Sequence, residues 1–433
     1  MALVPSQLCP PPRPALQTAA AQTNGREALM QAAVSGRAER GERGEWAQRG
    51  DTRDTVETHE PVRVTLGVDT HADVHVGVAL DRTGRRLGER TVPTTRAGYA
   101  ALAAWARRFG VLERVGIEGT GSYGAGLARW LRACGVAVVE VERPRRRDRQ
   151  ARLRLGKSDP IDAEAAARTA QAGTALGEPK AGDGRVEAIR TLRLARRSAV
   201  KARTQAANQL HALVVTAPDA LRDRLHGLPL ARLVAVAAAC RVSTPATPAT
   251  PEPLGAALLA ATKLALRSLA RRYRHLSAEV EALDARLAQL AATAAPELVA
   301  VKGVGTETAT ALLAAAGDNP GRLRGEAAFA RLCGVAPLPA SSGKTTRHRL
   351  SRGGNRDANR ALYLLALGRL SWDPRTRAYA ARRTAEGLSK PEILRCLKRY
   401  LARELYRLLV RAPTSPPATP AIPAGVSSDV PAA

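Results

Sequence analysis

Two aspartates, three positions apart, open a predicted helix in the segment "GKSDPIDAEAAAR" at residues 156–168. Asp159 and Asp162 would share one face of the first helical turn, because residues three apart are neighbours on a helix surface. We predict Asp159 as the N-cap, Pro160 at the first helical position and Asp162 at the third, where negative charge suits the helix dipole. Such a helix start can also present both carboxylates to a metal ion, so this segment alone leaves both interpretations open.

Two further acids end predicted strands: Asp69 in "GVDTH" and Glu118 in "GIEGT". Ligand sites in α/β sheets gather at the carboxyl ends of the strands. Four carboxylates that converged there would raise each other's pKa values unless a divalent cation compensated their charge. Magnesium prefers oxygen ligands, and two such ions can activate a nucleophile and stabilise a leaving oxygen on phosphate. We therefore predict that Asp69, Glu118, Asp159 and Asp162 hold Mg²⁺, with two ions expected, although each acid alone would also fit a turn or an ion pair.

The elements that must position these acids run from residue 63 to about residue 175. "VRVTLGVDTHADVHVGVALD" predicts two strands, and "LGERTVP" predicts a third after the turn signal "DRTG". Further along the chain we predict helices over 96–109 and 124–134 and strands over 114–120 and 136–141. A three-strand meander followed by alternating helices and strands is the order expected of a ribonuclease-H-like α/β domain.

The remainder of the chain predicts helices, so the fold class is α/β plus all-α. Residues 185–293 form a central region of long helices, interrupted by the proline-rich linker 243–253. Seven apolar residues of its second helix step by four and three, which predicts a coiled-coil seam. They are Leu269, Tyr273, Leu276, Val280, Leu283, Leu287 and Leu290. The pattern fits a dimer or a helix packed within its own chain equally well.

A C-terminal domain is predicted over 296–411. "LVAVKGVGTETATALLAAAG" indicates a helix–hairpin–helix in which Gly303 and Gly305 would offer backbone N–H groups to a phosphate. The segment 341–362 that follows is dense in hydroxyls, glycines and arginines. Four of its arginines could clamp backbone phosphates, or form a solvated basic loop. They are Arg347, Arg349, Arg352 and Arg356.

The charge of the whole chain indicates a polyanionic partner. Its 433 residues include 67 basic and 39 acidic ones, a net charge of +28, which predicts nucleic acid most simply and leaves a basic protein without a specific ligand as the alternative. The five cysteines contain no CxxC pair, which argues against a zinc ribbon and a disulfide framework. We find no apolar run of membrane-spanning length and no signal peptide, so we expect a cytoplasmic protein without a membrane partner. Residues 1–60 are predicted to be a disordered extension or the product of a start codon assigned too early, and 412–433 a disordered tail.

Several segments together resemble a known family. The first three resemble the N-terminal, RuvC-like domain of the DEDD transposases, which are insertion-sequence recombinases related to the Piv invertase: "LGVDTHADVHVGVALD", "GIEGTGSYG" and "KSDPIDAEAAAR". Three more are similar to the C-terminal domain of that family: "LVAVKGVGTETATALL", "FARLCGVAPLPASSG" and "RLSRGGNRDANRAL". The resemblance covers about residues 63–410, with the segments in the family's order.

The resemblance implies a chemistry and a set of partners. The four acids would be the metal ligands of the family, and a serine before the glycine of an "SG" motif would form a 5′-phosphoserine link to DNA. Here "ASSGK" offers Ser341 and Ser342, and we favour Ser342 because it adjoins Gly343. Donor and target DNA, a structured bridge RNA that guides the reaction, and a homodimer or homotetramer joined by the coiled coil are implied as partners. The expected location is the bacterial cytoplasm, at the nucleoid.

Three other classes of protein compete with this interpretation. A sugar-kinase-like or actin-like ATPase needs glycine soon after its first aspartate, and "DTHAD" has none. A RuvC-like or proofreading nuclease is the second, although proofreading exonucleases usually begin with Asp-x-Glu rather than "DTH". A non-catalytic nucleic-acid-binding scaffold explains the charge but not the acids. We interpret His71 and His75 as surface or packing residues rather than ligands, and the arginine-rich face of 185–203 as an RNA contact or a solvated helix face.

Overall fold

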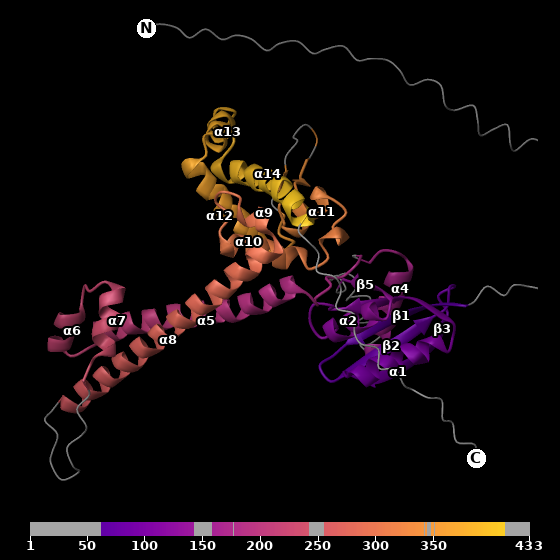
Figure 1. Cartoon of the computed structure of the whole chain (residues 1–433), viewed down its shortest axis with the longest axis horizontal. Coiled ribbons are helices and arrows are strands. Elements are labelled where there is room, and N and C mark those ends of the chain that lie inside the picture. The colour runs from indigo at the N-terminus through magenta and orange to yellow at the C-terminus, as the bar shows by residue number, and fades with distance from the viewer. Residues whose placement is uncertain are drawn as a thin grey trace, which may run out of the picture. The chain divides into compact units, whose positions relative to one another are not determined.

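The computed structural model describes residues 62–142, 158–175, 177–241, 255–341, 343, 348–349 and 351–411 (Figure 1). All the described residues belong to one unit of the chain, Glu60–Ala433. The predictions for residues 1–60, 243–253 and 412–433 therefore fall outside the described part of the chain.

A mixed sheet of five strands, in the order β3-β2-β1-β4-β5, forms the first part of this unit (Figure 1). β1, β2 and β3 are antiparallel neighbours, whereas β4 runs parallel to β1 and β5 runs parallel to β4. The predicted three-strand meander followed by alternating helices and strands is thereby confirmed. The strands are β1 (Arg63–Thr70), β2 (Val74–Leu80), β3 (Arg86–Pro93), β4 (Val111–Glu118) and β5 (Ala137–Val141).

Helices cover both faces of this sheet. Because both faces of β1 are therefore buried, its sequence is nearly continuously apolar. Val64, Leu66 and Val68 of β1 are buried in one core with residues of α1 (Arg96–Arg107) and α2 (Ala125–Ala133). On the opposite face α4 (Asp159–Gln171) buries small alanines in a separate core with apolar residues of β2. The acids predicted at the strand ends are therefore carried by a sheet that is packed on both sides.

Two long antiparallel helices, α5 and α8, run along each other in the central region (Figure 1). Ile189 near the start of α5 shares a core with Leu287 near the end of α8, and Leu210 shares another with Leu266 at the opposite ends. Residues at both ends of the predicted heptad seam thus pack within the chain, whereas the coiled coil and its use between chains stay predictions. The helices of this region are α5 (Arg185–Val215), α6 (Asp219–Leu225), α7 (Leu230–Ala238) and α8 (Ala256–Ala294).

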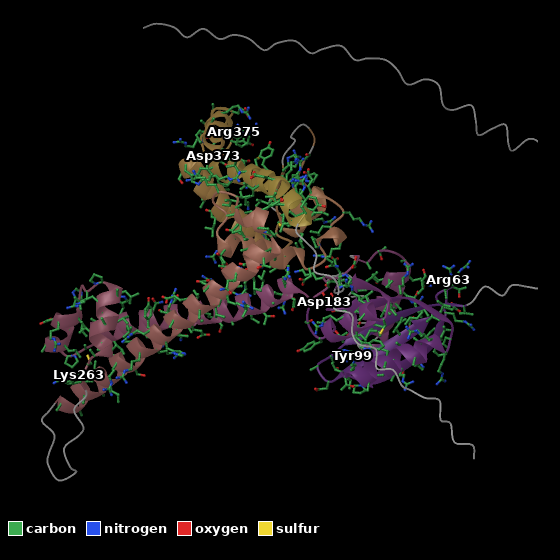
Figure 2. All side chains as sticks on the ribbon, in the orientation of Figure 1. Arg63, Tyr99, Asp183, Lys263, Asp373 and Arg375 are labelled. Carbon is green, nitrogen blue, oxygen red and sulfur yellow. The ribbon has the colours of Figure 1, made fainter. Side chains whose placement is uncertain are left out.

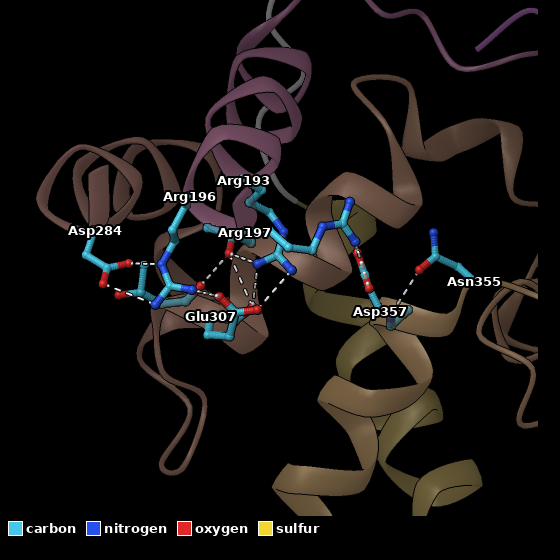
Figure 3. Close-up of polar contacts among 10 residues, drawn as sticks. Arg193, Arg196, Arg197, Asp284, Glu307, Asn355 and Asp357 are labelled. Atoms are coloured by element: carbon cyan, nitrogen blue, oxygen red, sulfur yellow. Dashed lines mark hydrogen bonds and ion pairs between the residues drawn. The ribbon is translucent and has the colours of Figure 1, made fainter. Parts of the chain in front are cut away.

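Arginines of α5 make ion pairs with acids of neighbouring helices (Figure 3). Arg193 donates to Oε1 of Glu307 at 3.0 Å, and Arg196 joins Asp284 to the same glutamate. Arg197 donates to Asp357 at 3.0 Å, and Arg190 pairs with Glu187 on its own helix. The arginine-rich face of 185–203, interpreted as an RNA contact or a solvated helix face, has seven basic residues, and the protein itself engages four of them. They are Arg190, Arg193, Arg196 and Arg197.

The C-terminal part is helical around a core that includes Phe329, Leu362 and Leu405. The predicted helix before the glycine hairpin is reduced to the four residues of α9. None of the helices in the described residues is long and apolar enough to cross a membrane. The elements are α9 (Pro296–Val299), α10 (Thr306–Ala316), η1 (Pro320–Arg322), α11 (Glu326–Leu332), β6 (Leu338–Pro339), β7 (His348–Arg349), α12 (Arg356–Trp372), α13 (Pro374–Ala385) and α14 (Lys390–Arg411).

Candidate metal centre

Paired glycines let α4 lie directly on the sheet. Gly67 of β1 and Gly116 of β4 are register partners in adjacent parallel strands. A Cβ on Gly67 would overlap the backbone of Ala163 and Ala167, and a Cβ on Gly116 would lie 2.6 Å from the carbonyl oxygen of Ala166. Side chains at these two positions would therefore push α4 away from the sheet.

The same register brings two of the acids together. Val68 pairs with Ile117, so Asp69 and Glu118 follow at equivalent positions on the two strands. Side chains alternate between the faces of a strand, and these two acids therefore point to the α4 side, like the Cβ positions of the glycines before them. The hydroxyl of Thr70 donates to the carbonyl oxygen of Glu118 at 2.9 Å and joins the two strand ends.

The start of α4 supplies the other two acids. Ser158, rather than Asp159, is the N-cap residue, so the predicted cap is wrong by one position and Asp159 is the first residue of the helix. The carbonyl oxygen of Ser158 accepts hydrogen bonds from the N–H groups of Ile161 and Asp162, at 3.0 and 3.2 Å. Asp159 stands one turn before Ala163, which meets β1, so its carboxylate is directed to the end of that strand.

The electrostatics of Asp69 indicate that the carboxylates act on one another. Its side chain is only 15% exposed. Burial raises the pKa of Asp69, and the charges of Asp162 and Asp159 raise it further, against the lowering effect of His71. A cation bound beside Asp69 would relieve both the burial of its charge and the repulsion. The donor set therefore fits a divalent metal ion.

A histidine that we expected to be a surface or packing residue, His71, lies within this group. Nε2 of His71 lies 3.2 Å from Oδ2 of Asp69 and 3.4 Å from Oδ2 of Asp159. Among the described residues, Asp69, His71 and Asp159 form the group whose possible ligand atoms all lie within 4.8 Å of one another. The available signal was the spacing "DTH", which puts the histidine two residues beyond the acid that ends β1.

The interpretation of His75 as a packing residue is confirmed. Its side chain is buried and its ring stacks on Tyr99, which Figure 2 labels, with 5.7 Å between the ring centroids. Burial lowers the pKa of His75, which favours the neutral imidazole. His75 is thus part of the packing beneath the strand end, whereas His71 lies among the acids.

The predicted nucleophilic serines lie in the C-terminal part, between Gly334 and Gly354; we call these residues the serine segment. Ser342 and Arg347 fall outside the described residues, and Ser341 is exposed just beyond β6. Leu338 of β6 pairs with Arg349 of β7, so the chain folds back on itself around this segment. Arg349, Arg352 and Arg356 are all exposed. Their exposure is compatible with phosphate contacts, which stay a prediction.

A close backbone approach and side-chain hydrogen bonds to the backbone join the two ends of the serine segment. A Cβ on Gly354, whose φ is +89°, would lie 2.5 Å from the backbone nitrogen of Gly334. The Nδ2 group of Asn359 donates to the carbonyl oxygens of Cys333 and Gly334, at 2.9 and 3.0 Å. Buried Lys398 in turn donates to Oδ1 of Asn359 at 2.9 Å. No spacing in the sequence points to this asparagine–lysine pair.

The glycine hairpin before α10 has the expected local form. Gly303 has a φ of +89°, and Gly305 is the N-cap residue of α10. The ammonium group of Lys302 lies 4.5 Å from the ring centroid of Trp372, so a positive charge stands beside the hairpin. Binding of a phosphate at Gly303 and Gly305 stays a prediction.

The order of the five strands, three antiparallel followed by two parallel, fits a ribonuclease-H-like domain. The family model of DEDD transposases of the IS110 type matches residues 66–217, and that of the transposase IS116/IS110/IS902 family matches residues 295–381. The chain belongs to this family of transposases. It is also 33% identical, over 145 residues, to an uncharacterized 43.6 kDa protein of insertion element IS110 from Streptomyces coelicolor. That alignment spans 33% of this chain and 36% of the relative.

Proposed function

We propose that this protein is the transposase of an insertion sequence and cuts and rejoins DNA. The observation that carries the proposal is the meeting of Asp69, Asp159 and His71, with Glu118 in register beside Asp69, in a chain that belongs to a transposase family. Asp69, Glu118, Asp159 and Asp162 would hold Mg²⁺, with two ions expected. When bound, magnesium would polarise the scissile phosphate and lower the pKa of the attacking hydroxyl.

The attacking group in this proposal is a serine of the segment "ASSGK", with Ser342 favoured over Ser341. Its Oγ attacks phosphorus and loses its proton to solvent, the bond from phosphorus to the 3′ oxygen breaks, and that oxygen leaves and takes up a proton. The product is a 5′-phosphoserine link and a free 3′ hydroxyl. Attack of a 3′ hydroxyl on the link reverses these steps and rejoins the strands. The covalent link conserves the energy of the phosphodiester bond, so joining needs no nucleotide cofactor.

Donor and target DNA are the proposed substrates, and a structured bridge RNA is the proposed guide. The net charge of +28 and the exposed Arg349, Arg352 and Arg356 support a polyanionic partner. Arg347 and the hairpin glycines Gly303 and Gly305 are proposed to add contacts to phosphate. A homodimer or homotetramer, located in the bacterial cytoplasm at the nucleoid, completes the proposal.

The test uses the purified full chain with Mg²⁺, supercoiled DNA carrying the element with both flanks, and RNA transcribed from the element's noncoding flank. We expect a protease-sensitive protein–DNA adduct that resists detergent, is lost in EDTA and is lost in Asp69→Ala and Asp162→Ala. Ser342→Ala should remove the adduct while Ser341→Ala retains it, and the opposite result would assign the nucleophile to Ser341. An adduct that survives EDTA would refute the metal centre.

The remaining outcomes distinguish the competing classes. Strand cleavage without an adduct in any condition would indicate a RuvC-like nuclease that uses water. ATP hydrolysis without DNA would indicate the ATPase class. Nucleic-acid binding that is unaffected by EDTA, with neither cleavage nor adduct, would indicate a scaffold.

A further inference from the structure

We infer that His71 is a metal ligand of the proposed centre and shares one ion with Asp69 and Asp159. The centre then has a mixed nitrogen and oxygen donor set rather than carboxylates alone. The inference rests on the proposed function, because it assumes that this end of the sheet binds a divalent cation. It goes further in giving that cation a nitrogen ligand and hence a preference among metals.

The distances around Nε2 of His71 suit a shared ion. Two ligand atoms bound at right angles to an ion such as Mg²⁺ or Mn²⁺ are separated by about 3.0 Å, since each bond is about 2.1 Å long. Nε2 stands 3.2 Å from Oδ2 of Asp69 and 3.4 Å from Oδ2 of Asp159. Shifts of a few tenths of an ångström would bring the three atoms into one coordination sphere.

The backbone of the turn between β1 and β2 holds His71 in this position. Its N–H donates to the carbonyl oxygen of Val74 at 3.1 Å, which closes the turn. Thr94, beyond the end of β3, donates its N–H to the carbonyl oxygen of Asp73 at 2.8 Å. A ligand held by a fixed turn loses little conformational entropy when a metal binds.

A purely structural role for the imidazole is the alternative. Its side chain is 43% exposed, and those of its partners Asp69 and Asp159 are 15% and 45% exposed. Contacts of an imidazole with that much solvent around it contribute on the order of 0–1 kcal/mol to stability. The fold therefore gains little from an imidazole at position 71, whereas a metal would gain a ligand.

A nitrogen ligand alters metal preference in a predictable direction. Mn²⁺ and Mg²⁺ both bind carboxylate oxygen well, but Mn²⁺, a transition-metal ion, accepts an imidazole nitrogen more readily than Mg²⁺ does. Loss of His71 should therefore weaken binding of Mn²⁺ more than binding of Mg²⁺. Carboxylate ligands alone would give no reason for such a difference between the two ions.

The experiment measures Mn²⁺ bound to the full chain without nucleic acid, by titration and by pulsed electron paramagnetic resonance. We expect the wild-type spectrum to show a ¹⁴N coupling of a directly bound imidazole. His71→Ala should abolish that coupling and weaken Mn²⁺ binding about tenfold or more. His211→Ala, which removes an exposed histidine of α5, is the matched control and should change neither quantity.

The wild-type spectrum alone can overturn the inference, even if His71→Ala fails to fold. Bound Mn²⁺ without a ¹⁴N coupling, or a coupling that persists in His71→Ala, would exclude His71 as a ligand. Asp159→Asn separates this failure from failure of the proposed function. If Mn²⁺ binds to wild type without nitrogen and Asp159→Asn weakens it, the carboxylate centre stands and only the role of His71 is lost. Absence of Mn²⁺ binding to wild type would overturn both.

Discussion

Two regions of this chain carry the residues proposed for chemistry, and close backbone approaches at glycines shape both of them. At the metal centre, Gly67 of β1 and Gly116 of β4 have no side chain, so α4 packs directly against the sheet. In the C-terminal region, Gly334 and Gly354 touch each other at the two ends of the segment that carries the serines. Gly67 and Gly116 thus position the helix that carries Asp159 and Asp162, whereas Gly334 and Gly354 join the two ends of the serine segment.

Because the glycine contacts differ, substitutions in the two regions should impair different steps of the reaction. The acids depend on the packing between α4 and the sheet, so a change under α4 should act on metal binding. The serine segment depends on contacts at its base, made by Gly354, Asn359 and their neighbours. A change at that base should act on the covalent step and leave metal binding intact. The comparison can therefore be tested by substitutions that keep every proposed catalytic residue.

The largest effect is expected for Gly67→Ala. The added Cβ would overlap the backbone of Ala163 and lie 2.7 Å from the Cβ of Ala167, so α4 must move. We expect the free energy of unfolding to fall by about 3 kcal/mol and Mn²⁺ binding to weaken strongly. Gly121→Ala, where a new Cβ meets no atom within 4 Å, is the control. Chemical denaturation and Mn²⁺ titration measure the two quantities, and unchanged metal binding in Gly67→Ala would show that α4 does not position the acids.

A smaller and separate effect is expected for Gly354→Ala. The left-handed φ of +89° and the 2.5 Å approach to the backbone nitrogen of Gly334 both oppose a side chain there. We expect a loss of about 2 kcal/mol in stability, loss of the protein–DNA adduct and normal Mn²⁺ binding. Gly353→Ala, at the adjacent position with open space around its Cβ, should behave as wild type. Weakened Mn²⁺ binding in a folded Gly354→Ala protein would show that the two regions are coupled.

Features of the two regions that depend on local sequence could be predicted, whereas contacts between residues far apart in the chain could not. The succession of strands and helices along the α/β domain and the placement of Asp69 at a strand end follow from local apolar patterns, and the structure bears them out. The predicted N-cap of α4 was wrong by one residue, because Ser158 and Asp159 are consecutive and both residue types are good N-caps. Lys398 was missed because its partner Asn359 lies 39 residues away. The spacing "DTH" places His71 near Asp69, but its second partner, Asp159, lies 88 residues further along the chain. Only the folded chain brings such pairs together, and a single sequence carries no periodicity that reports them.

A third prediction concerns the base of the serine segment and its dependence on pH. Burial lowers the pKa of Lys398, and the charge of Arg395 lowers it further, so folding opposes protonation of this amine. Wild type should therefore become more stable, relative to Lys398→Met, as pH rises through the lowered pKa. Near neutral pH the variant should lose about 1 kcal/mol, because Oδ1 of Asn359 loses its donor. Denaturation at several pH values measures both effects, with the exposed Lys390→Met as control. A difference in stability between wild type and Lys398→Met that does not change with pH would contradict a lowered pKa of the Lys398 amine.

The smallest effect is expected at the ion pairs that join α5 to α10. Glu307 accepts from Arg193 and Arg196, but its side chain is 54% exposed, so solvent screens both contacts. Glu307→Gln should lower stability by less than about 1 kcal/mol and leave metal binding and the adduct unchanged. Glu281→Gln on the exposed surface of α8 is the control. Because Arg193 also donates to Thr310 and Arg196 to Asp284, both arginines keep a partner in the variant. A rise in RNA affinity in Glu307→Gln, absent in Glu281→Gln, would instead show that these arginines compete between the protein's own acids and a nucleic-acid backbone.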